Sequence, residues 1–325
     1  MKLSKKIILA FAALTFSSSI YALDGSDFSS LTSNPNYFAD TINDGLDDFT
    51  TQLANAIPQA ATQQNVWADA YIGKLFPSVP FHLGGGFNVA LTHIDTSGIA
   101  KAASALEIDG IKDSYYYPVF TADLRIGGIL FPFDCDIAVM KTGTLSTSAM
   151  GCDLDVDFLT VGFDFRYALL EGGLVLPKLS VGVGYFYNQG SFGAGNSDAE
   201  LNVDYKIHTM YAQAQVSKSF LIFTPFVGLR GLVSKCDNSY DWKVKNTQFL
   251  TAADAAKQLG TTVATNGSGN YKTDSFDFGA IQPQIYAGVG LNFLVLQTTL
   301  SISADLRNIW DDGLWSGAFS FRVKL

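Results

Sequence analysis

From about residue 66 onward the chain alternates apolar and polar residues with a period of two, which is typical of β-strands with two unlike faces. Six segments alternate cleanly, at 81–93, 120–130, 179–187, 223–233, 281–293 and 315–325. Further strands are expected at 66–74, 133–141, 154–169, 201–216 and 297–308. In 154–169 and 201–216 the apolar residues change face part-way along. At 158–159 this change predicts a β-bulge, and near 207–210 it leaves the facing of the strand open.

One face of the predicted strands is aliphatic and aromatic, and the other is small, polar or charged. The spacing Asp-x-Arg, which occurs three times, puts both charges of a pair on the same face. A soluble β-protein would bury the apolar face, whereas a transmembrane barrel turns it to lipid and turns the polar face to a lumen. In the barrel reading the charges that face the lumen are Asp123, Arg125, Asp164, Arg166, Arg230, Asp305 and Arg307.

Loop lengths and aromatic residues favour the membrane barrel. Short connections near 75–80, 131–132, 170–177, 217–220 and 294–296 alternate with longer ones near 95–114, 142–152, 189–200 and 236–274. Aromatic residues gather at both ends of the strands, as the two bilayer interfaces select. Only 16% of the residues are charged, against about 25% in soluble domains.

The first 65 residues have a different pattern. Residues 1–22 resemble a secretory signal peptide, with cleavage near Ala22; this would leave a formal net charge of −12, which argues against nucleic acid as a partner. Residues 23–65 contain six aspartates and no Lys or Arg, and apolar residues at helical spacing predict an amphipathic helix over 35–57 that ends at Pro58. A helix of roughly 35 Å matches the height of a barrel. It is a candidate plug whose charge would oppose the luminal arginines, or else a periplasmic segment.

The C-terminal "LWSGAFSFRVKL" resembles the β-signal of bacterial outer-membrane proteins, by which the assembly machinery recognises the last strand. That family usually ends in Phe, whereas this chain ends in Leu325. A second stretch, "FTPFVGLRG" at 223–231, resembles the strand that follows a periplasmic turn in small outer-membrane barrels. The residues that carry the signal are Trp315, Gly317, Phe319, Phe321, Val323 and Leu325.

Together these observations predict an all-β fold: a transmembrane antiparallel up-and-down β-barrel of about 10–12 strands, comprising residues 66–325, after an N-terminal amphipathic helix. The resemblance implies the outer membrane of a diderm bacterium, with the lipid bilayer and the assembly machinery as partners. Ten to twelve strands would enclose a narrow lumen. The expected function is passive passage of small solutes, or transport of a hydrophobic ligand past the N-terminal segment. The alternative is a surface protein that displays its long loops to an unknown extracellular partner.

No enzyme, cofactor or metal is expected. His93 falls near the predicted extracellular rim, but no nucleophile motif accompanies it, so an outer-membrane hydrolase is the least favoured reading. The run "CDLDVDF" at 152–158 and its neighbours Asp134 and Asp136 could suggest calcium; a solvated acidic lumen wall is favoured. Three cysteines at unrelated spacing predict free thiols or at most one disulfide.

Overall fold

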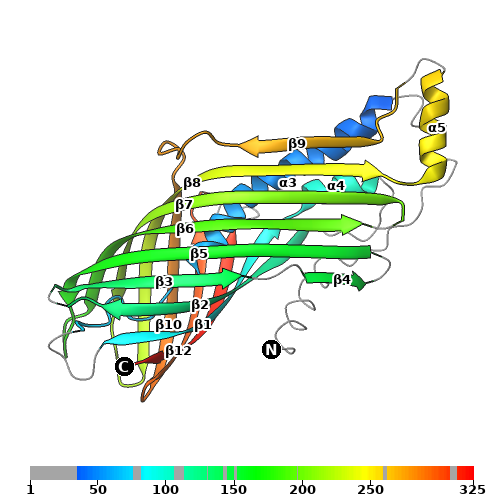
Figure 1. Ribbon diagram of the computed structural model, residues 1–325. Coiled ribbons are helices and arrows are strands. Elements are labelled where there is room, and N and C mark those ends of the chain that lie inside the picture. Colours follow the sequence, from blue (N-terminus) through cyan, green and yellow to red (C-terminus); the bar gives the residue numbers. More distant parts are fainter. Residues whose placement is uncertain are drawn as a thin grey trace.

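The computed structural model describes residues 35–75, 82–105, 113–129, 131–141, 145–149, 152–195, 197–258, 262–307 and 313–325. The expected signal peptide, its cleavage near Ala22 and the start of the acidic segment lie outside the described residues. The described chain is mostly antiparallel strand, with one long helix near its beginning (Figure 1).

Among the described residues, ten strands form a closed ring in which every neighbouring pair is antiparallel. The pairing of β1 with β12 and of β8 with β10 closes the ring, so the predicted transmembrane β-barrel is confirmed. The ring consists of β1 (Leu83–Asp95), β2 (Ser114–Gly127), β3 (Phe133–Lys141), β5 (Cys152–Glu171), β6 (Lys178–Gly195), β7 (Ala199–Ser217), β8 (Phe223–Val244), β10 (Gln282–Phe293), β11 (Leu296–Asp305) and β12 (Trp315–Lys324).

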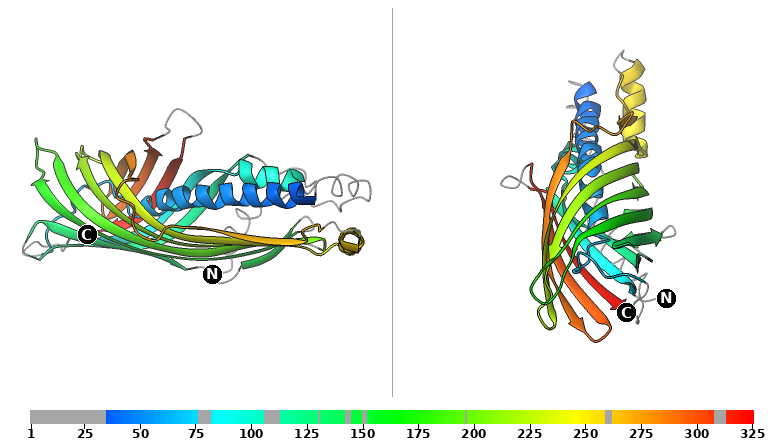
Figure 2. Two further views of the ribbon diagram at one scale, coloured as in Figure 1. Left: turned by 90° about the horizontal axis from the view of Figure 1, so that it is seen from above. Right: turned by 90° about the vertical axis from the view of Figure 1, so that its left-hand side faces the viewer.

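Two short strands widen the wall on one side without entering the ring. We call the end of the wall at which β5 to β8 extend beyond the ring the upper end. There, β4 (Leu145–Ala149) pairs with residues 152–156 of β5, and β9 (Asn266–Lys272) pairs with residues 237–243 of β8. Below the part of β8 that pairs with β9, residues 223–232 of β8 pair with β10. The wall from β5 to β9 therefore continues well above the ring as a curved, open sheet (Figure 2).

The strand expected at 66–74 does not form, and the barrel wall begins at Leu83 rather than at residue 66. Residues 66–72 are buried on all sides, with at most 6% of any residue exposed, so their alternation does not reflect two different environments. The loop expected at 189–200 is also largely absent, because β6 continues to Gly195 and β7 starts at Ala199.

The helix α3 (Pro35–Thr62) confirms the expected N-terminal helix but passes through Pro58 instead of ending there. Proline has no N–H, so the carbonyl of Ala54, four residues earlier, loses its partner within the helix. The thiol of Cys236 lies 4.0 Å from that carbonyl oxygen and donates to it from the wall. A tertiary contact thus replaces one missing helical bond, which sequence periodicity cannot anticipate.

The helix α3 lies along the inner face of the upper sheet (Figure 2), and a hydrophobic core fills the space between them. Two further helices, α4 (Ser97–Ala105) and α5 (Thr247–Gln258), contribute to it. Leu46 and Leu53 of α3 are each 1% exposed in this core, and the ring of Trp242 packs there from β8. None of the described helices is both long enough and apolar enough to span a bilayer.

The polarity of the wall inverts along its height while the strands stay regular. On β7 the inward residues are apolar at Val203, Tyr205 and Ile207 and become polar from Thr209 downward. The outward residues change in the opposite sense, from charged above to apolar at Met210 and below. Because the pairing of β7 with β6 runs without a shift, the change of face in 201–216 is a change of surroundings.

The same holds for β5, where the expected bulge at 158–159 is wrong. Its register with β6 is unbroken from Asp153 to Ala168, and the one irregularity lies at Ala168/Leu170. Below Leu159 the outside of the wall meets lipid and the inside meets a polar lumen. Above it, the outside meets water and the inside meets the core against α3. The level of inversion therefore marks the upper edge of the membrane-facing band.

Candidate functional site

The lumen of the barrel is occupied by the chain itself. After α3 ends at Thr62, residues 63–72 have no helix or strand and are at most 6% exposed. We call residues 62–72 the lumen segment. Side chains from all ten strands of the described ring contact it, so it lies inside the wall.

Barrel side chains bind the main chain of the lumen segment at nine successive carbonyl groups, from Thr62 to Ala70. The donor-to-oxygen distances run from 2.6 to 3.4 Å. Irregular backbone in a protein interior needs such partners, because it lacks the bonds of a helix or sheet. The donors are Arg230 to Thr62, Asn88 to Gln63 and Gln64, Arg322 to Gln64 and Val66, Arg166 to Asn65, Gln215 to Trp67 and Ala68, and Arg125 to Asp69 and Ala70.

The side chain of Trp67 is the main anchor of the lumen segment. The guanidinium carbons of Arg322 and Arg125 lie 4.4 Å and 5.5 Å from its ring centre, and its Nε1 donates to Asp136 Oδ2 at 3.0 Å. The absence of a side chain at Gly84 makes room for the ring, since a Cβ there would lie 2.8 Å from it. The indole thus combines a buried hydrogen bond with two cation–π contacts.

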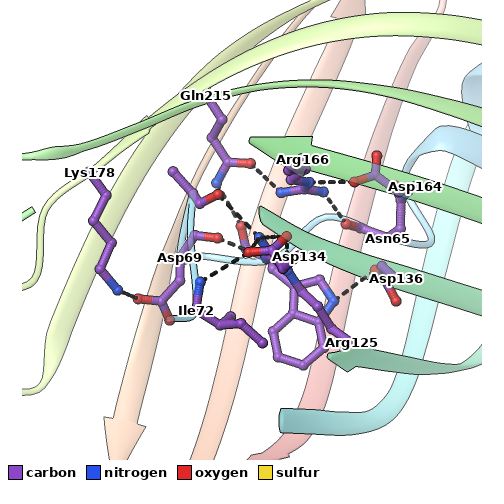
Figure 3. Close-up of polar contacts among 12 residues, drawn as sticks. Asn65, Asp69, Ile72, Arg125, Asp134, Asp136, Asp164, Arg166, Lys178 and Gln215 are labelled. Atoms are coloured by element: carbon purple, nitrogen blue, oxygen red, sulfur yellow. Dashed lines mark hydrogen bonds and ion pairs between the residues drawn. The ribbon is translucent and has the colours of Figure 1, made fainter. Parts of the chain in front are cut away.

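Asp69 is the one carboxylate that the lumen segment presents to the wall. Lys178 Nζ lies 2.9 Å from Oδ1, and Lys324 Nζ lies 2.6 Å from Oδ2. The amide of Gln297 also donates to Oδ2, at 2.9 Å. Figure 3 shows Lys178 reaching Asp69 from one side of the lumen, while Ile72 donates its backbone N–H to Asp134.

The wall also neutralises its own charges. Three buried ion pairs join Arg125 to Asp134 at 2.8 Å, Arg166 to Asp164 at 2.6 Å, and Arg322 to Asp123 at 2.6 Å. Arg230 has no such carboxylate partner among the described ion pairs. Its guanidinium carbon instead lies 4.3 Å from the ring centre of Tyr286, and its Nε donates to Gln213.

The structure places six of the seven predicted lumen charges inside the wall. Asp123, Arg125, Asp164, Arg166, Arg230 and Asp305 are all buried there. The seventh, Arg307, follows the end of β11 and is 37% exposed, where it pairs with Asp305 at 2.6 Å and donates to Asn55 of α3. Only two of the three Asp-x-Arg repeats are therefore ion pairs within the repeat, because Asp123 and Arg125 each pair with another strand.

Sequence reasoning missed several functional residues, chiefly Asp69, Arg322 and the two lysines that bind Asp69. Arg322 and Lys324 lie on the polar face of the last strand, which was visible in the sequence. Their partners in the lumen segment were not, because the alternation at 66–74 predicts a strand of the wall.

Asp134 and Asp136 are buried inside the wall, whereas the aspartates of α3 and Asp155 lie elsewhere than expected. The α3 aspartates Asp40, Asp44, Asp47 and Asp48 are exposed and do not meet the luminal arginines. Asp155 on β5 is exposed outside the wall above the level of inversion, so it is no part of a lumen wall. Among the described residues, no group of three His, Cys, Asp or Glu is arranged to hold a metal ion.

The remaining predicted positions face outward. Trp315, Phe319, Phe321, Val323 and Leu325 are 41–52% exposed on the lipid side of β12, and Gly317 shares their face.

His93 also lies on the outer face, in contact with aromatic rings. It stacks on Trp315 with ring centres 6.0 Å apart and meets Tyr116 edge-on at 5.7 Å. Cys135 and Cys236 are free thiols.

Neither a family model nor a curated protein matches the sequence. Among solved structures, the outer membrane protease OmpT from Escherichia coli aligns with 8% identity and a TM-score of 0.43, covering 76% of this chain and 98% of that one. The translocator domain of the autotransporter NalP from Neisseria meningitidis aligns with 10% identity and a TM-score of 0.37, covering 77% and 91%. The toluene transporter TbuX from Ralstonia pickettii aligns with 8% identity and a TM-score of 0.23, covering 75% and 89%. Similarity at this level carries no argument about activity.

Proposed function

We propose that this outer-membrane-type β-barrel is a gated passage for small polar solutes, closed by the lumen segment. The observation that carries the proposal is the binding of nine successive main-chain carbonyls by wall side chains. Wall side chains hold this segment in the lumen by hydrogen bonds, as side chains of a binding site hold a ligand. It can leave without breaking any bond between strands.

The wall is built to remain stable when the segment leaves. The ten strands pair with one another, and three of the four arginines that bind carbonyls have a carboxylate partner in the wall itself. Removal of the segment therefore leaves these arginines paired. Water can satisfy the remaining donors, which makes release far less costly than the exposure of an apolar core.

The chemistry of the wall favours polar solutes. Arginines and aspartates from several strands face one another across a narrow lumen, and a hydrophobic molecule would gain nothing from contact with them. A ten-stranded ring lies just above the eight strands whose interior side chains fill completely. Passage of a hydrophobic ligand and a purely structural surface role are the alternative functions, and the experiment below distinguishes the surface role from a passage.

The proposed location is the outer membrane of a diderm bacterium. The apolar outer band of the wall, its polar lumen and the exposed apolar face of β12 support it. Recognition of that last strand by the assembly machinery is part of the same proposal.

A reversible tether tests the gate. The backbone N–H of Ala70 donates to Ser217 Oγ at 2.9 Å, so Ala70→Cys with Ser217→Cys, in a chain whose native cysteines are replaced by serine, can join the segment to the wall. We expect openings of the untethered protein in planar bilayers, none after oxidation, and their return after reduction. Each single-cysteine variant is the control and should not respond to oxidation.

A deletion of residues 23–75 completes the experiment. The shortened chain should conduct small ions continuously, because nothing then occupies the lumen. Near-zero conductance in both the full and the shortened chain would overturn the passage and favour the surface role. Openings that persist in the oxidised tether would show that the segment is not the gate.

A further inference from the structure

The outer face of β6, β7 and β8 carries two features that the proposed passage does not use. One is a shallow apolar groove in the membrane-facing band, and the other is a basic and aromatic cluster directly above it. Both lie on the same three strands, and together they have the form of a binding site for one lipid molecule.

The groove arises because small residues replace large ones on the middle strand. Ala212 and Ala214 of β7 form its floor, flanked by Val183 of β6 and Leu229 of β8. The flanking residues are 57% and 55% exposed, so the groove opens to the outside of the barrel. Tyr167 of β5 extends its wall on one side.

The cluster lies at the level where the outside of the wall changes from apolar to charged. His208 stands directly opposite Lys235 across the β7–β8 pair, and Lys206 is two residues higher on the same face of β7. The hydroxyl group of Tyr185 lies 2.7 Å from His208 Nδ1, and the ring of Tyr187 is 5.0 Å from the imidazole ring.

Lys206 and Lys235 are not neutralised by ion pairs with neighbouring carboxylates. Neither Lys206 nor Lys235 takes part in the ion pairs found in the described part of the chain. Asp237, which faces Lys206 across the strand pair, is held by Lys272 at 3.1 Å. In a protein whose formal net charge is −9, this leaves a local positive site at the membrane edge.

We propose that the basic cluster of Lys206, His208 and Lys235 binds the anionic headgroup of a membrane lipid, whose acyl chain lies in the groove at Ala212 and Ala214. The spacing supports this. Six residues separate His208 from Ala214, about 20 Å along the strand, or about 15 Å of depth at the usual strand tilt. That depth equals one leaflet, half of a hydrocarbon core of about 30 Å.

Native mass spectrometry of the detergent-solubilised full chain tests the site. Dimyristoyl phosphatidylglycerol and dimyristoyl phosphatidylcholine have the same acyl chains and differ in headgroup charge. We expect the wild type to retain one phosphatidylglycerol preferentially. The double variant Lys206→Gln/Lys235→Gln should weaken that retention at least about tenfold, because each lysine near a membrane surface contributes on the order of a factor of five.

The matched control for charge is Lys243→Gln/Lys257→Gln, which removes two exposed lysines far above the membrane edge. It should retain the lipid as the wild type does. Inorganic phosphate at millimolar concentration should not displace the lipid, since it lacks the acyl chain; displacement would instead indicate a simple anion site and overturn the lipid proposal.

The groove has its own control. Ala212→Leu/Ala214→Leu should lower the retention of both lipids by filling the floor, whereas Ala287→Leu adds one leucine side chain on the outer face of β10, away from the groove, and should not. Equal retention of both lipids by the wild type, or unchanged retention in the lysine double variant, would overturn the site. Heat-modifiable migration on gels verifies that each variant is a folded barrel.

Discussion

Replacement of Trp67 should release the lumen segment without disturbing the wall. Its indole N–H donates to Asp136, a buried hydrogen bond worth about 0.5–1.5 kcal/mol. Its two cation–π contacts contribute about 0.5–2 kcal/mol each. Trp67→Leu removes all three, so the docked state should lose about 1.5–5.5 kcal/mol relative to the released state. At 1.4 kcal/mol per factor of ten, the released population rises at least about tenfold.

The rate at which a polar maleimide labels a cysteine at Ala70 reports that population, because Ala70 is fully buried while the segment is docked. Trp67→Phe keeps a ring between the arginines but loses the N–H, so its labelling rate should lie between those of the wild type and Trp67→Leu. Trp242→Phe removes a similar indole bond, from Nε1 to Asn43 Oδ1 at 2.8 Å, in the core above the barrel. It should leave the labelling unchanged.

Two results would refute this reasoning. If Trp67→Leu labels at the wild-type rate, the indole does not hold the segment. If Trp242→Phe accelerates labelling as much as Trp67→Leu does, the segment is released by loss of the upper core and the lumen contacts are secondary.

Other predictions concern the wall, the helix and the outer face. Phe163→Arg puts a charge on the lipid side of β5 near mid-band and should lower the free energy of unfolding by about 2–4 kcal/mol in refolding titrations in liposomes, whereas Ser191→Arg, above the level of inversion, should cost less than about 1 kcal/mol. Leu46→Ala should cost about 2–5 kcal/mol of core packing and make α3 sensitive to protease, while the barrel keeps its heat-modifiable migration. His93→Ala should change nothing in lipase or protease assays, since its contacts are aromatic; loss of an activity present in the wild type would refute this.

Sequence reasoning predicted the barrel well because lipid imposes one strict rule on one face of each strand. Segments such as 223–233 and 281–293 contain apolar residues at alternate positions, and these are the outward residues of β8 and β10. The rule failed where the surroundings change along a single strand. At 201–216 the period of two is intact, but each face meets a different medium above and below Ile207.

The site could not be predicted for a related reason. Residues 66–72 touch wall side chains in every direction, so their side chains show no preference for one face. The partners of the arginines are main-chain carbonyls, which every residue carries and which leave no mark in a sequence. The charged residues of the wall were identified as lumen-facing from their alternation, but what they bind became visible only in three dimensions.

Recognition of main chain rather than side chains has a consequence for how this protein can vary. Substitutions at Gln64 or Ala68 leave the carbonyls to which Arg322 and Gln215 donate in place, so different side chains can dock there provided that they fit the buried space. The arginines and glutamines of the wall have no such freedom, because each must reach a fixed oxygen. The lumen segment can therefore diverge between related proteins while the barrel that holds it stays the same. A search for relatives is better based on the spacing of the wall residues than on the amino-acid sequence of the segment.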